Sequence, residues 1–203
     1  MNRKASRHLQ DADPVLRRII EEVGTCRIQY RRPDFSTLAR AIVFQQLNGT
    51  AARTIYGRLE ACLAKGRVTP RSVLQAPLPR LRAAGLSGRK AAYLRDLAEK
   101  ASRGALRFGR LAALSDEEVI AALTQVKGVG VWTAHMFLIF ALRRPDVLAV
   151  GDYGVRSAAR KAYGLDRLPT PTELARLARP WRPYCSAACW YLWRSLELPK
   201  REP

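Results

Sequence analysis

Two glycines, Gly128 and Gly130, lie beside Lys127 between two segments with helical patterning. Glycine lets a backbone turn sharply and approach another molecule closely. Such a hairpin leaves N–H groups exposed at the start of the second helix, where the helix dipole favours a phosphate group. The pattern alone is a weak signal, because it also describes an ordinary helix–helix turn. Within a strongly basic helical chain it favours binding to DNA.

A single carboxylate, Asp152, follows the hairpin at the start of a helix predicted over 153–163. Aspartate is a good N-cap residue, so one interpretation of Asp152 is structural. The other interpretation is that the helix start presents the carboxylate for chemistry. The two roles are compatible.

The composition indicates a folded, strongly basic protein. The chain has 203 residues, 36 Lys and Arg against 17 Asp and Glu, and a net charge of +19. Hydrophobic residues make up 48%, which excludes a disordered basic tail. The charge favours a polyanionic partner, first nucleic acid and second a membrane surface, although an arginine-rich genome would also raise it.

The periodicity predicts an all-α protein. Residues 1–10 are expected to be flexible, and four cysteines to be small buried residues of a reduced protein. No signal peptide and no apolar run of the ~20 residues that a bilayer span requires are present, which predicts a cytoplasmic location. The helices are expected over 14–24, 35–47, 50–64, 87–104, 115–126, 131–143, 153–163, 172–179 and 183–197, with short ones within 70–86.

The hairpin followed by Asp152 resembles the signature of the helix-hairpin-helix (HhH-GPD) DNA glycosylase superfamily, with AlkA-type 3-methyladenine DNA glycosylase II as the most similar branch. Three further segments resemble this branch in the same order: 35–47 with its Gln-Gln pair, 83–91 with Gly-Leu-Ser and Lys-Ala, and the aromatic stretch 181–193. The resemblance implies one domain over 1–203, with two helical lobes, an active-site cleft between them, and the hairpin and catalytic segment at 115–164. The chain is similar to a compact form of the family, without the N-terminal β domain.

The resemblance implies that Asp152 is catalytic. A fixed carboxylate stabilises the oxocarbenium character that develops on the sugar when an N-glycosidic bond breaks, and it can orient the attacking water. An alkylated purine of the 3-methyladenine or 7-methylguanine type is already cationic and leaves without a general acid. We therefore expect a glycosylase of base excision repair. The alternatives are a glycosylase for other damaged bases, and a non-catalytic helix-hairpin-helix module that only binds DNA.

The remaining site residues are also assigned by the resemblance. Trp132 stands where lyase members have a Schiff-base lysine, so we expect no lyase activity. Leu47 is either a residue inserted into the duplex or a core leucine, and a bulky residue at Gly130 is expected to distort the turn. The base pocket is expected to contain Trp132, Met136, Tyr153 and Trp193. The DNA-binding residues are expected to be Gln46, Leu47, Lys127, Gly128, Val129, Gly130 and Thr133.

The resemblance also bears on cofactors and partners. The backbone carbonyls of Thr124, Val126 and Val129 are expected to be able to hold Na+ or K+, with no other cofactor required. Only Cys185 and Cys189 stand where iron–sulfur members have four cysteines, so no iron–sulfur cluster is expected. The expected partner of this nucleoid-associated monomer is double-stranded DNA with alkylated bases, and no membrane is expected to bind.

Overall fold

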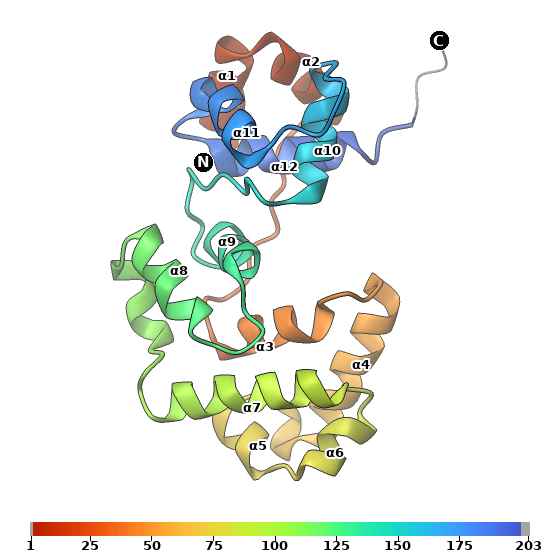
Figure 1. Ribbon diagram of the computed structural model, residues 1–203, viewed down its shortest axis with the longest axis vertical. Coiled ribbons are helices and arrows are strands. Elements are labelled where there is room, and N and C mark those ends of the chain that lie inside the picture. Colours follow the sequence, from red (N-terminus) through yellow and green to blue (C-terminus); the bar gives the residue numbers. More distant parts are fainter. Residues whose placement is uncertain (1, 200–203) are drawn as a thin grey trace. The chain divides into compact units, whose positions relative to one another are not determined.

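The computed structural model describes residues 2–199, and these form helices and no strand, which confirms the all-α prediction (Figure 1). The chain divides into two compact units. The first combines Met1–Tyr30 with Arg143–Pro203, and the second comprises Arg31–Leu142. Within the described residues no helix is both long and apolar enough to cross a membrane.

The first unit is assembled around a buried C-terminal helix, α12 (Cys185–Ser195), which packs against α2 (Pro14–Val23) and α10 (Tyr153–Ala162). Its other helices are α1 (Asn2–Ala12), α11 (Pro171–Leu177) and the 3-10 turn η3 (Arg179–Trp181). Asp13 caps α2 and is buried, and its carboxylate accepts hydrogen bonds from the Trp181 indole at 2.9 Å and the Tyr163 hydroxyl at 2.5 Å. These bonds tie the two chain segments of this unit together.

The flexibility predicted for residues 1–10 is wrong for the described part of that segment. Residues from Asn2 onward form α1, which packs against α2 and α12. Ala5 and Leu9 are buried at this contact, one helical turn apart. These two apolar residues dock the helix together with Ser6, whose hydroxyl forms a hydrogen bond of 2.8 Å with the Tyr191 hydroxyl of α12. Met1 lies outside the described residues.

The second unit has α7 (Gly88–Ser102) at its centre, packed against α3 (Phe35–Phe44) and α5 (Pro70–Gln75). Figure 1 shows α7 running across this unit, with α5 and α6 along one side of it. The other elements are α4 (Gly49–Cys62), η1 (Ala64–Gly66), α6 (Leu78–Ala83), η2 (Phe108–Ala113), α8 (Asp116–Thr124) and α9 (Val131–Phe140).

Local capping signals explain most helix boundaries. Ser115 and Glu118 form the expected capping box before α8, and Gly24 ends α2 as predicted. However, α3 ends at Phe44 rather than at Leu47, because Gln45 leaves the helical region with ψ of 133° and Gln46 then takes a left-handed φ of 56°. Cys62 is only partly buried, whereas the other three cysteines are buried as predicted.

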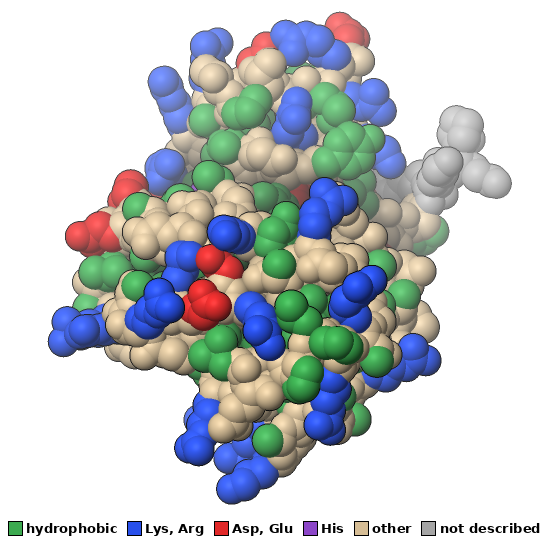
Figure 2. Space-filling model, turned by 60° about the horizontal axis from the view of Figure 1, so that its bottom comes forward, with side chains coloured by type: hydrophobic (Ala, Val, Ile, Leu, Met, Phe, Trp, Pro, Cys, Tyr) green, Lys and Arg blue, Asp and Glu red, His purple; other side chains and the backbone are tan. Residues whose placement is uncertain are grey.

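The positive charge is spread widely over the surface. In the space-filling view of Figure 2, Lys and Arg side chains are distributed over the whole visible face, while Asp and Glu occur only in small groups. Such a distribution gives attraction to a polyanion over a broad surface rather than at one helix.

Candidate functional site

The hairpin between α8 and α9 has the geometry of an anion site. Gly128 takes a left-handed φ of 79°, and Gly130 is the N-cap of α9 in an extended conformation. Gly130, as the N-cap residue, has no side chain that could cap this helix start. The start of α9 therefore points N–H groups and the positive end of the helix dipole to a place that suits a phosphate oxygen.

Three side chains from elsewhere in the second unit hold this hairpin. The Gln45 side chain donates a hydrogen bond of 2.8 Å from Nε2 to the Gly128 carbonyl, and Asp96 accepts the Lys127 N–H at 2.8 Å. The Tyr93 ring lies so close to Gly128 that an added Cβ would be 2.2 Å from it. None of these three supports was identified from the sequence. Gln45 was noticed only as part of the Gln-Gln pair at 45–46, without a role at the hairpin.

The same geometry corrects the expectation for Gly130. A Cβ added at Gly130 would meet no atom within 4 Å, and its φ of −99° suits any residue. A side chain there therefore leaves the turn intact, and its only effect would be on an approaching ligand. The residue that the turn requires as glycine is Gly128, through both its φ and the Tyr93 contact.

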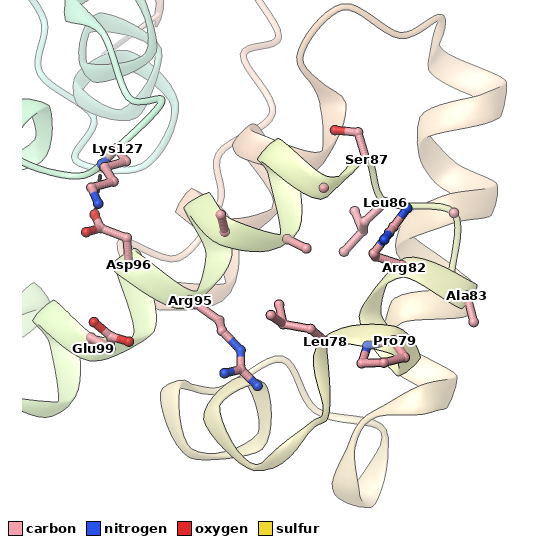
Figure 3. A pocket seen from close by; sticks show the side chains of 14 residues that line it. Leu78, Pro79, Arg82, Ala83, Leu86, Ser87, Arg95, Asp96, Glu99 and Lys127 are labelled. Carbon is pink, nitrogen blue, oxygen red and sulfur yellow. Dashed lines mark hydrogen bonds between the residues drawn. The ribbon is translucent and has the colours of Figure 1, made fainter.

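Two separate cavities lie near the hairpin. Figure 3 shows the first, of about 1070 Å³, between α6 and α7, with the Asp96–Lys127 contact at one end. Of the predicted site residues, only Lys127 lines it. A second cavity of about 680 Å³ gathers most of the predicted residues of this unit. Those that line it are Gln46, Leu47, Gly128, Gly130, Trp132, Thr133 and Met136.

The exposed fraction of each side chain shows which of these residues could contact DNA or a base. Leu47 is 38% exposed beyond the end of α3, so its interpretation as a core leucine is wrong. Trp132 is 47% exposed at the start of α9, which makes its ring available to the cavity. Thr133 is only 4% exposed and Val129 is buried, so their side chains cannot contact DNA. These two residues can contribute backbone groups only.

The carbonyl groups proposed for a cation are backbone oxygens near the same turn. The Val126 carbonyl accepts the Val129 N–H at 3.0 Å, which leaves one of its two lone pairs for another partner. Neutral carbonyl oxygens suit a hard monovalent cation rather than a transition metal. The donor set of Thr124, Val126 and Val129 therefore fits Na+ or K+ in its chemistry.

In the first unit, Asp152 is held firmly at the start of α10. It is 8% exposed, and its Oδ1 accepts the Val155 N–H at 2.7 Å and the Trp193 indole N–H at 2.8 Å. Tyr153 follows it and is 70% exposed, whereas Trp193 is partly buried. The structural interpretation of Asp152 as an N-cap is confirmed, and the cap orients the carboxylate.

A glycine that sequence reasoning overlooked packs against this carboxylate. A Cβ added at Gly154 would lie 3.1 Å from Asp152 Oδ1 and 3.1 Å from Trp193 Cδ1. Gly154 therefore allows the carboxylate and the indole to meet. The signal in the sequence was the glycine two residues after Asp152, inside a helix where glycine is unfavourable.

Cys185 and Cys189 are both buried in α12. Burial raises the pKa of the Cys189 thiol to about 12, so this residue is protonated near neutral pH. Within residues 2–199 no group of three or more His, Cys, Asp and Glu side chains could hold a metal ion. The absence of an iron–sulfur cluster stays a prediction.

The comparisons with known proteins identify the class. Residues 39–183 match the model of the HhH-GPD superfamily of base excision DNA repair proteins, and the chain belongs to this superfamily. The resemblance deduced from the hairpin and Asp152 is thereby confirmed.

Individual relatives show which members of the superfamily the chain is similar to. The chain is 34% identical to DNA-3-methyladenine glycosylase 1 of Schizosaccharomyces pombe, over 96% of this chain and 88% of the relative. Its fold is similar to that of S. pombe 3-methyladenine DNA glycosylase in complex with abasic DNA, with a TM-score of 0.86, 34% identity and coverage of 96% and 97% of the two chains. It is also similar to a DNA-3-methyladenine glycosidase from Bacillus halodurans, with a TM-score of 0.85, 36% identity and coverage of 94% and 88%.

Proposed function

We propose that this protein is a monofunctional DNA glycosylase of base excision repair that hydrolyses the N-glycosidic bond of alkylated purines, of the 3-methyladenine or 7-methylguanine type. The observation that carries the proposal is the buried Asp152, oriented by the Val155 and Trp193 N–H groups, in a chain of the HhH-GPD superfamily. The names of the relatives support the same activity.

The chemistry requires only one carboxylate. Departure of the base places positive charge on the sugar, and a preoriented Asp152 stabilises that charge in a site protected from water. The same carboxylate orients or deprotonates the water that attacks the sugar. An alkylated purine carries its own positive charge, so it does not need the second carboxyl group that glycosidases of neutral sugars use.

DNA is the partner, and the hairpin is its proposed phosphate anchor. The N–H groups at the start of α9 bind phosphate oxygens of the DNA backbone without reading its sequence. The base rotates out of the duplex, and the cavity lined by Trp132 and Met136 offers an aromatic face that attracts a cationic base. Leu47, at the Gln46–Leu47 turn, is the residue that fills the gap left in the duplex.

Trp132 has no amine, so the enzyme forms no Schiff base at that position and leaves an abasic site. No cofactor takes part in hydrolysis. The carbonyls of Thr124, Val126 and Val129 would hold a monovalent cation, which adds positive charge beside the phosphate. The protein acts as a monomer at the nucleoid.

The test is the release of free base from randomly methylated duplex DNA, separated by chromatography, with the parent protein and Asp152→Asn. The parent should release 3-methyladenine and 7-methylguanine, and the variant should lose about a hundredfold or more in rate while it binds an abasic-analogue duplex normally. Release only from duplexes with deaminated or oxidised bases would favour another lesion class. Binding without release of any base would identify a non-catalytic module.

A further inference from the structure

Lys90, on the first turns of α7, caps the end of a different helix. Its ammonium group donates hydrogen bonds of 2.7 Å to the Val43 carbonyl and 2.7 Å to the Gln45 carbonyl. These carbonyls lie in the last turn of α3 and just beyond it, where a helix leaves oxygens without intrahelical partners and carries a partial negative charge.

Lys90 is partly buried at this contact. Burial lowers the pKa of Lys90, and among the described residues no acidic side chain pairs with it. The two carbonyl oxygens therefore stabilise the partly desolvated charge. In the sequence, Lys90 was notable only for the Lys-Ala pair that resembles the family. Its partner Gln45 lies 45 positions away in the chain, so no local pattern links the two residues.

The contact lies between the end of α3 and the hairpin that is proposed to bind DNA. Gln45 accepts from Lys90 through its carbonyl and donates through its side chain to the Gly128 carbonyl of the hairpin. The next residue, Gln46, has the left-handed φ of 56°, and Leu47 after it is exposed. A non-glycine residue in this conformation is held there by its surroundings.

We propose that Lys90 is a positioning residue that fixes the Gln45–Leu47 turn against the hairpin, in the conformation that enters the duplex. This inference rests on the proposed glycosylase function. Lys90 acts on the insertion step and on extrusion of the base, and it does not act on bond cleavage by Asp152. Loss of the ammonium group frees two carbonyls and lets Gln46 leave its left-handed conformation.

The experiment compares Lys90→Met, Lys90→Arg and Lys4→Met with the parent. Met keeps the apolar stem of Lys90 without its charge, Arg restores a cation, and Lys4 is an exposed residue of α1 that controls for the loss of one charge. Single-turnover base release is measured on a duplex with a paired lesion and on a duplex with the lesion in a bulge, where extrusion costs less. Unfolding midpoints are recorded for all four proteins.

Lys90→Met should lose about tenfold or more on the paired lesion, the effect of a lost hydrogen bond to a charged group, and much less on the bulged lesion. Lys90→Arg should recover part of that loss, and Lys4→Met should match the parent on both substrates. An equal loss on both substrates by a folded Lys90→Met protein would overturn the proposal, as would a parental rate on the paired lesion.

A second readout does not depend on catalysis. A 2-aminopurine placed next to an abasic analogue in a duplex reports local unstacking when the turn inserts. The parent should raise its fluorescence, and Lys90→Met should raise it less at saturating protein. If Lys90→Met does not fold, Lys90→Gln, which keeps a donor, takes its place in both assays. A parent that inserts but releases no base would refute the glycosylase function and leave the positioning role standing, whereas equal fluorescence for parent and variant would refute the positioning role.

Discussion

The indole N–H of Trp193 and the carboxylate of Asp152 are joined by a hydrogen bond of 2.8 Å, on the same oxygen that caps α10. Trp193 was predicted as part of the base pocket. The structure gives its N–H group a different use, because it fixes the rotation of the carboxylate from a residue 41 positions away in the chain. The Val155 and Trp193 N–H groups both bond to Oδ1. They fix the orientation of the carboxylate and so preorganise it to stabilise positive charge.

Removal of the indole donor should slow the reaction without removing the aromatic ring. Trp193→Phe keeps an aromatic ring in the partly buried site, and it removes the N–H group together with the five-membered ring that carries it. We expect the single-turnover rate of base release to fall about tenfold, the value of one hydrogen bond to a charged group, while affinity for an abasic-analogue duplex is retained. An unchanged rate would show that the Trp193 N–H is not needed to orient Asp152.

Gly154 offers a second way to disturb the same pair. A Cβ in Gly154→Ala would lie 3.1 Å from both Asp152 Oδ1 and Trp193 Cδ1, so one of them must shift by a few tenths of an ångström. We expect slower base release with the fold retained. Gly57→Ala in α4 is the control, because a Cβ there meets no atom within 4 Å. The idea fails if the two alanine variants release base at the same rate.

The two hairpin glycines should separate folding from DNA binding. Gly128→Ala forces a Cβ to within 2.2 Å of the Tyr93 ring in a left-handed conformation, so we expect it to lower the unfolding midpoint. Gly130→Val should unfold like the parent and bind every DNA sequence more weakly, because it obstructs a phosphate contact. Thermal unfolding and titration of an abasic-analogue duplex distinguish them. Parental binding by Gly130→Val would contradict the phosphate anchor.

Lys127 should contribute long-range charge rather than a fixed contact. Its backbone N–H is held by Asp96, whereas its side chain is exposed. We expect Lys127→Ala to reduce the slope of log affinity against log salt by about one unit at most. A salt titration measures this. A slope equal to that of the parent would place the Lys127 charge outside the DNA interface.

The Asp96 support of the hairpin should depend on pH. Burial by itself raises the pKa of Asp96, but hydrogen bonds from Lys100 and from the Lys127 N–H outweigh burial and hold the pKa below its ordinary value. A lowered pKa means that the ionised group stabilises the fold above the ordinary value of 3.8 and that this contribution is lost as pH falls through the folded-state pKa. Asp96→Asn should therefore be less stable than the parent near neutral pH, and the difference should shrink in acid. Equal denaturation curves at neutral pH would contradict this.

Borohydride during turnover should trap no protein–DNA adduct, because an indole replaces the Schiff-base amine at position 132. The assay uses duplex DNA with an alkylated base and a lysine-dependent lyase as positive control. A trapped band would reveal another lysine as nucleophile, and Lys127→Ala and Lys90→Arg would then show which one forms the adduct.

Local patterns in the sequence determined much of this protein. Gly128 and Gly130 between two helical segments, Asp152 at a helix start and the capping box at Ser115 are recognisable because capping and turn formation involve residues only a few positions apart. These signals predicted the helical class, and their resemblance to the HhH-GPD superfamily implied that Asp152 is the catalytic candidate. They also placed most helix boundaries within a turn.

Only the tertiary structure decided which distant residues support the site. Gln45 and Gly128 are 83 positions apart, and Asp96 and Lys127 are 31 apart, so no local pattern links them. The exposure of Leu47 depended on where α3 ends, and the docking of α1 depended on surfaces supplied by α2 and α12. Such contacts are selected by the packing of the whole chain, because each side chain's partner is determined by neighbours that the fold brings together.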